Sequence, residues 1–263
     1  MFKAVLLLIC SFVCMCCADA QIKKKIKKGR RNKSESQFML GKDYLQAEWE
    51  IGHESITSDI STTVYPNLAV RYGINRHLEV NAEISFVTAT DNNSQHINTT
   101  GLEPVALGIN YLLRSETKTG PAIVFSVQVA IPFMAGNNFT ASYFAPVIEL
   151  IVEKVVSPRI TIATSGGAFW DGFSPNPSFI YNAAASYNFT KKWMLTTEWF
   201  GFVNGELPLH NTDINISYAL NKQVQFGITS GIGLSPAAHK SYFSINGVLG
   251  CSLKKKIKRI DIF

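Results

Sequence analysis

Acidic side chains recur at alternate positions in several segments that are otherwise built from apolar and small residues. Glu79 and Glu83 occupy polar positions of the segment 78–86, in which Leu, Val, Ala, Ile and Phe take the alternate positions. This alternation is typical of a β-strand with one apolar face, so both carboxylates are expected on the other face. The same parity places further charged residues on that second face: Glu48, Glu50, Glu149, Glu153, Glu198, Asp213 and one arginine, Arg71.

A surface that carries many carboxylates concentrates cations and disfavours anions, so these residues are candidate lumen or selectivity positions of a channel. Arg71 and Glu79 flank a short turn, and a three-residue turn would place them directly opposite each other. Such a pair stabilises a hairpin and fixes its register. A direct role of Arg71 and Glu79 in selecting the solute is the second interpretation.

Residues suited to catalysis or metal binding are present, but their spacing forms no motif. The five histidines stand at no helical metal spacing, and neither His210 nor His53 with Ser55 belongs to a hydrolase motif. Gly166-Gly167 is not followed by a helix or a lysine, as a phosphate-binding loop would be. We therefore expect no catalytic residues, no metal site and no cofactor, and a protein that is not an enzyme.

The N-terminus has the pattern of an export signal. Lys3 precedes a nearly continuous apolar run over 4–17, and Ala18-Asp19-Ala20 resembles a signal-peptidase site. Residues 1–20 are therefore predicted to be a cleaved signal peptide. A membrane anchor helix and a lipoprotein site at Cys16 or Cys17 are the alternatives. After cleavage Cys251 is the only cysteine, so the fold cannot depend on an internal disulfide.

The net charge of +6 comes from two basic tails, at 21–37 and 254–263. Between residues 38 and 253, 11 Lys and Arg stand against 16 Asp and Glu, so this body has a net charge of −5. Nucleic-acid binding would rest on the tails alone, and no aromatic residues interleave with their lysines, so no nucleic-acid partner is expected. The tails are expected to be solvated or to contact lipid headgroups.

Residues 38–253 contain no apolar run long enough for a transmembrane helix, and instead repeat alternating segments of about ten residues. Aromatic residues gather near the ends of the apolar faces, as in the lipid-facing girdles of outer-membrane barrels. The predicted fold is all-β, an antiparallel up-and-down transmembrane β-barrel; a soluble all-β protein is the alternative. Twelve strands are predicted: 44–53, 64–73, 78–88, 101–113, 121–132, 143–155, 159–169, 178–189, 193–203, 211–220, 224–234 and 241–253.

Tight turns and longer loops alternate between these strands, which predicts periplasmic turns and external loops. The even strand number places both tails in the periplasm. Cys251 is expected to face lipid, and Phe200 and Phe202, if inward, would narrow the bore. The terminal Phe263 resembles the final aromatic residue that the barrel assembly machinery reads, so outer-membrane lipid and that machinery are expected partners.

The segment Pro66-Asn67-Leu68-Ala69-Val70-Arg71-Tyr72-Gly73, followed by a turn and Leu78-Glu79-Val80, resembles a family of outer-membrane transporters of the meta-pathway of phenol degradation. The pattern from Glu103-Pro104 to Tyr111, and from Gly120-Pro121 to Pro132, is similar too. The resemblance implies an outer-membrane barrel with a transport role, and small hydrophobic or aromatic solutes. The basic N-terminal run has no counterpart in the family pattern.

Together these observations predict a passive outer-membrane channel for small solutes with a narrow, acidic lumen that favours cations. Two other classes remain open at this point. A barrel enzyme acting on lipid would need a Ser-His pair at the outer rim, and a structural or adhesion barrel would lack a continuous water path.

Overall fold

The structure is a computed structural model that describes residues 39–92, 97–203, 208–236 and 238–253. The expected signal peptide, both basic tails, His96 and Phe263 lie outside the described residues. The described chain is mainly antiparallel β-sheet, with two short 3-10 turns, η1 (Pro132–Met134) and η2 (Asn137–Phe139). No helix in this described part is long and apolar enough to cross a membrane.

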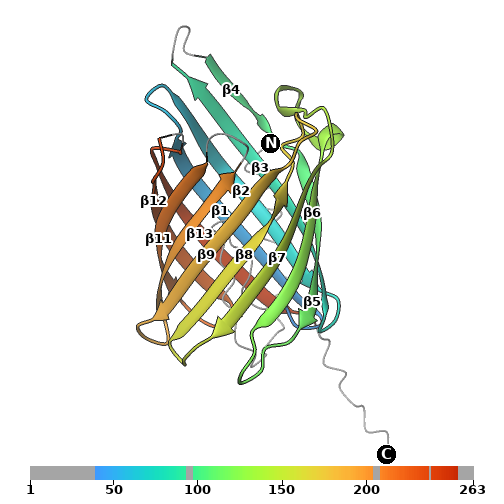
Figure 1. Ribbon diagram of the computed structural model, residues 1–263, viewed down its shortest axis with the longest axis vertical. Helices are drawn as coiled ribbons and strands as arrows, with labels where there is room; N and C mark the ends of the chain where they lie inside the picture. Colours follow the sequence, from blue (N-terminus) through green and yellow to red (C-terminus); the bar gives the residue numbers. More distant parts are fainter. Residues whose placement is uncertain (1–38, 93–96, 204–207, 237, 254–263) are drawn as a thin grey trace, which may run out of the picture.

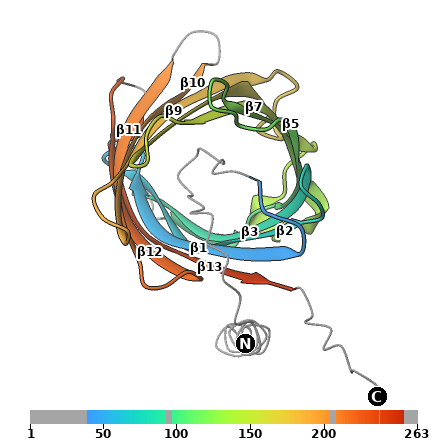
Figure 2. The same ribbon diagram turned by 90° about the horizontal axis from the view of Figure 1, so that it is seen from below.

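The strands follow one another along the chain with the bounds β1 (Tyr44–Ser55), β2 (Ile60–Gly73), β3 (Leu78–Asp91), β4 (Ile97–Leu102), β5 (Val105–Arg114), β6 (Ala122–Ile131), β7 (Ala145–Val155), β8 (Ile160–Phe169), β9 (Ser178–Asn188), β10 (Trp193–Val203), β11 (Leu209–Ala219), β12 (Val224–Gly233) and β13 (Ser241–Ser252). Each pairs with its neighbours in antiparallel register, and β1 pairs with both β2 and β13. The sheet therefore closes on itself as a barrel of tilted strands (Figure 1), and the interior of the barrel is visible from below in Figure 2.

The barrel has twelve wall positions because β4 and β5 share one of them. The C-terminal part of β3, residues 86–91, pairs with β4, and its N-terminal part, residues 78–83, pairs with β5. Glu103 and Pro104 separate the two strands, and Pro104 has no backbone N–H to donate to a sheet ladder. The predicted twelve-stranded barrel is thus confirmed, whereas the single strand predicted over 101–113 is interrupted.

Alternation along each strand divides the wall into two faces, as predicted. The outward positions carry exposed apolar side chains such as Ile84, Trp199 and Ile214, and the inward positions are polar or small and mostly buried. A closed sheet satisfies its own backbone hydrogen bonds and has no free edge, which is what a lipid environment requires. Inward residues therefore determine what the interior can hold.

The two ends of the barrel differ. Tight turns join strands at the lower edge in Figure 1, and β4 together with the longer connections lies at the upper edge. The connection 170–177 is held by Asp171, whose carboxylate accepts the backbone N–H groups of Ser174 and Phe173 at 2.8 Å. These hydrogen bonds lower the pKa of Asp171 below its usual value.

The register of the β2–β3 hairpin differs from the expected one. Gly73 pairs with Glu79, and Arg71 pairs with Asn81. The predicted pairing of Arg71 with Glu79 is therefore wrong by two residues. Four residues, 74–77, separate β2 from β3, and within this turn the Asn75 side chain accepts the backbone N–H groups of residues 77 and 78. A shift of two leaves every side chain on its predicted face.

Candidate functional site: the barrel lumen

The charged residues selected from the sequence gather on the buried, inward face. Among the described residues, the buried charged side chains are Glu48, Glu79, Glu149, Glu153, Glu198, Asp213 and a single basic one, Arg71. Glu50 and Glu83 are partly buried and line a cavity in the same interior. The strands thus bring all nine candidate residues to the lumen side of the wall.

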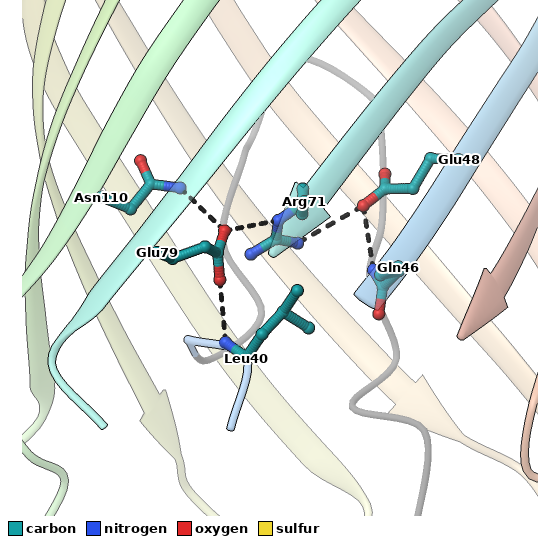
Figure 3. A network of polar contacts seen from close by, with 6 residues as sticks. All are labelled: Leu40, Gln46, Glu48, Arg71, Glu79 and Asn110. Carbon is teal, nitrogen blue, oxygen red and sulfur yellow. Dashed lines mark hydrogen bonds and ion pairs between the residues drawn. The ribbon is translucent and has the colours of Figure 1, made fainter. Parts of the chain in front are cut away.

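Arg71 forms an ion pair with Glu79 at the tight-turn end of the lumen (Figure 3). Its Nε donates to Glu79 Oε1 at 2.7 Å, and its Nη1 lies 3.4 Å from Glu48 Oε1. Gln46 Nε2 donates to the same Glu48 oxygen at 2.9 Å, and Asn110 Nδ2 donates to Glu79 Oε1 at 3.0 Å. The predicted ion pair is therefore formed, diagonally across the hairpin.

Residues 39–43, which we call the N-terminal strap, lie inside this end of the barrel. Leu40 is 1% exposed, and its backbone N–H donates to Glu79 Oε2 at 2.8 Å. Met39 packs against the inward side chains of Val124 and Ile151. Figure 2 shows the short blue segment directly before β1 bending into the ring of strands. The strap therefore occupies part of the bore, a feature that the sequence did not predict.

A glycine permits this close approach of the strap to the wall. A Cβ atom on Gly73 would overlap the carbonyl oxygen of Gly41 and lie 2.9 Å from that of Leu40. The N–H of Asp43 donates to Gly73 O at 2.8 Å, and Asp43 itself has a φ of 57°. Any larger residue at position 73 would thus have to displace the strap.

A cavity of about 410 Å³ lies in the lumen beyond this network. Glu83 accepts hydrogen bonds from Asn67 Nδ2 at 2.9 Å and from Gln128 Nε2 at 3.0 Å. Glu149 accepts one from Ser165 Oγ at 3.0 Å. These three donors are neutral side chains, and their hydrogen bonds hold the two carboxyl groups in place.

Aromatic rings form another part of the cavity wall. Phe169, Phe200, Phe202 and Tyr242 all line it. Phe169 and Phe202 pack edge to face with centroids 5.8 Å apart, and Phe200 packs against Tyr242 at 6.2 Å. The inward position of Phe200 and Phe202, which was conditional in the sequence, is confirmed. Tyr242 was not predicted, although its parity with Ser244 on β13 would have placed it inward.

Glu54 is a further inward carboxylate that the sequence reasoning missed. It lies beyond the predicted end of the first strand, lines the cavity and forms an ion pair with His239. The parity of Glu48 and Glu50 extends to it once β1 reaches Ser55. The other described histidines near the outer rim have different partners: His53 bonds to Thr63, and His210 to Tyr181.

The geometry of a hydrolase is not found in the described part of the chain. No serine hydroxyl there hydrogen-bonds to a histidine ring, and no group of three or more His, Cys, Asp or Glu side chains among those residues could hold a metal ion. Cys251, predicted to face lipid, shares its parity with Leu249 and Leu253 but is buried.

The sequence matches a known family over residues 28–250, and the family is described as "Putative MetA-pathway of phenol degradation". The chain belongs to this family. The match covers most of the chain and confirms the resemblance that the Pro66–Val80 segment suggested. No curated protein matches the sequence significantly.

Solved structures with the same fold are outer-membrane barrels. An outer membrane channel from Pseudomonas putida F1 aligns with a TM-score of 0.66 at 11% identity, over 85% of this chain and 100% of that one. The NanC porin aligns with a TM-score of 0.53 at 11% identity, over 77% and 98%. At these identities the likeness shows the fold, an outer-membrane β-barrel, and the interior must be interpreted from its own residues.

Proposed function

We propose that this protein is a passive outer-membrane channel for small solutes, with a narrow lumen that favours cations. The observation that carries the proposal is the composition of the inward face: Glu48, Glu79, Glu149, Glu153, Glu198 and Asp213 are buried there against Arg71 as the one buried basic residue of the described chain. The family and the barrel fold support a transport role.

Physical chemistry links this composition to conduction. A buried carboxylate in a dry interior loses its hydration or binds a proton, and both are costly. Water in the lumen removes most of that cost, so an interior of this composition favours a wet bore. Carboxylates lining a narrow aqueous path raise the local concentration of cations, an effect that added salt weakens.

The N-terminal strap restricts the proposed path at one end. Leu40 lies beside Glu79, and Met39 packs against Val124 and Ile151, so passage is expected to be limited to small solutes. Both ends of the described chain lie at this edge, since Leu253 N–H donates to Asp43 O at 2.7 Å. We assign this edge to the periplasm, because short turns face the periplasm in outer-membrane barrels.

The test is the reversal potential of the purified full-length protein in a planar bilayer under a potassium chloride gradient. We expect cation preference, and a smaller preference when Glu83→Gln and Glu198→Gln are combined. Gln keeps the size and shape of the side chain while removing its charge, so the barrel should remain folded.

Glu116→Gln is the matched control for this measurement. Glu116 lies in the turn between β5 and β6 and pairs with Lys154 at 3.5 Å, outside the cavity lining. The control should leave the reversal potential unchanged. Absence of conductance would contradict the channel, and anion preference would contradict the acidic lumen.

A further inference from the structure

The cavity in the lumen is lined by carboxylates on one part of its wall and by phenyl rings on another. Glu83, Glu149 and Asp213 line it together with the phenyl rings of Phe200 and Phe202. An inorganic cation would leave the apolar surface of the phenyl rings uncovered, and a neutral hydrocarbon would leave the negative charge of the carboxylates unbalanced. A ligand that uses both must carry a positive charge and an apolar surface.

The aromatic side of the cavity is built by contacts between strands that are not direct neighbours in the sheet. Phe200 on β10 packs against Tyr242 on β13, although β11 and β12 separate these strands in the sheet. Gly231 on β12 permits this, because a Cβ atom there would overlap the Tyr242 ring. The ring of Tyr242 can therefore lie over β12, with its hydroxyl donating to Asp213 Oδ2 at 2.8 Å.

The polar side of the cavity offers hydrogen-bond acceptors. Asn182 and Ser244 are each 3% exposed and line the cavity. Within the described part of the chain, Asn182 Oδ1 and Ser244 Oγ are buried atoms with no hydrogen-bond partner. Asn182 Nδ2 donates to Glu198 Oε2 at 3.4 Å, which leaves the Oδ1 atom as an acceptor. Buried polar atoms of this kind are normally satisfied, and an N–H donor on a ligand would satisfy them.

We propose that this cavity binds organic ammonium ions that carry an aromatic or other apolar group. The ammonium would be attracted by Glu149 and Asp213 and donate to Asn182 Oδ1, and the apolar group would pack against Phe200 and Phe202. Aromatic faces also attract cations directly, most strongly where water is excluded. The proposal deepens the channel function and rests on it for its role in transport, but binding itself does not require conduction.

Phenethylammonium is the probe, because it joins a primary ammonium to one phenyl ring. Binding is measured by titration calorimetry on the full-length barrel in detergent micelles, with heats from empty micelles subtracted. Three comparison compounds separate the contributions: 2-phenylethanol lacks the charge, 3-phenylpropanoate reverses it, and ethylammonium lacks the ring. We expect phenethylammonium to bind more tightly than all three.

Two substitutions test the two walls of the cavity. Phe200→Ala should weaken phenethylammonium binding by about 2- to 30-fold, the range expected for loss of a cation–π contact. Glu149→Gln should weaken phenethylammonium binding and leave the weak binding of 2-phenylethanol unchanged. Phe179→Ala is the matched control, since Phe179 is an exposed phenylalanine on the outward face of β9 and should leave binding unaltered.

Folding of each variant is checked by the difference in gel migration between boiled and unboiled samples. Phe202→Ala replaces Phe200→Ala if the latter fails to fold. Equal affinity for phenethylammonium and 2-phenylethanol would overturn the proposal, as would unchanged binding in both cavity variants. Cation-selective conductance without phenethylammonium binding would refute this inference alone, whereas binding without conductance would refute the channel alone.

Discussion

Arg71 is held between two carboxylates in a part of the lumen where little surface is exposed. Glu79, its nearer partner, is fully buried and also accepts the N–H of Leu40 and the amide of Asn110. Removing charges from water is expensive, and such a pair is stable only when the remaining hydrogen bonds are made. The Asn110 and Leu40 donors meet that condition for Glu79.

Substitution of Arg71 should therefore be more damaging than loss of an ion pair nearer the surface. Arg71→Met leaves Glu79 and Glu48 without this guanidinium, and loss of one partner of a buried ion pair costs about 3–5 kcal/mol. The measurement is the denaturant midpoint of refolded protein in detergent. Lys154→Met is the control, because Lys154 is only partly buried and its pair with Glu116 and its hydrogen bonds to the backbone carbonyl groups of residues 117, 118 and 120 lie in a turn, so its loss should cost less than the loss of Arg71. Similar midpoints for the two variants would contradict the structural role of Arg71.

The residue-scale predictions succeeded where they rested on parity and failed where they rested on turn geometry. Alternation alone placed Arg71 and Glu79 on the inward face. Their register depended on the turn, in which the Asn75 side chain accepts two backbone N–H groups. An asparagine in a turn permits several such geometries, so the sequence did not select one.

At the scale of elements, the N-terminal strap is the feature that the sequence did not predict. Residues 39–43 show no alternation, and their position depends on partners distant in the sequence, such as Ile151. Pro104 in the sequence could have indicated the interruption between β4 and β5. The pairing of β4 with the end of β3, in contrast, is known only from the structure. Regular alternation therefore predicted the strands, but it gave no prediction for the strap that enters the lumen.

Gly73→Ala should release the strap without opening the barrel. The added methyl group would overlap the strap backbone, and overpacking of this kind costs about 1–3 kcal/mol. That cost is comparable to the roughly 1.5–3 kcal/mol contributed by a hydrogen bond to a charged acceptor, such as the one from Leu40 to Glu79. We expect a larger single-channel conductance than in the parent protein.

Gly166→Ala is the matched control for the strap prediction. A Cβ atom on Gly166 would lie 3.7 Å from the ring of Phe179 and 3.9 Å from the carbonyl oxygen of Ile180, which is ordinary van der Waals contact. Its conductance should equal that of the parent protein. An unchanged conductance in Gly73→Ala would show that the strap does not limit the path.

At the scale of the whole molecule, the pairing of β1 with β13 closes the wall, and β4, which pairs with β3 alone, extends beyond the wall at the upper edge. The outward face is apolar around the wall, with exposed residues such as Phe125, Trp193 and Phe243 on strands far apart in the sequence. A molecule with such a surface is stable in lipid and resists detergent, because its backbone hydrogen bonds are satisfied internally. The overall fold was accessible from sequence because this two-face pattern repeats in every wall strand.

The protein should fractionate with the outer membrane and migrate faster on gels when it is not boiled. Both expectations follow from a compact, closed barrel with an apolar outer surface. The measurement is membrane fractionation, followed by electrophoresis of heated and unheated samples. Recovery in the soluble periplasmic fraction would contradict the membrane assignment.

The contacts of Asp43 have a consequence for the order of assembly. Its N–H donates to Gly73 at the end of β2, and its carbonyl oxygen accepts the N–H of Leu253, just after β13. Leu253 comes beside Asp43 only when the last strand has paired with the first. The complete set of strap contacts therefore cannot form on an open sheet. The contact of Asp43 with Leu253 is made only when β13 pairs with β1, so closure of the wall also fixes the strap at its final point of attachment.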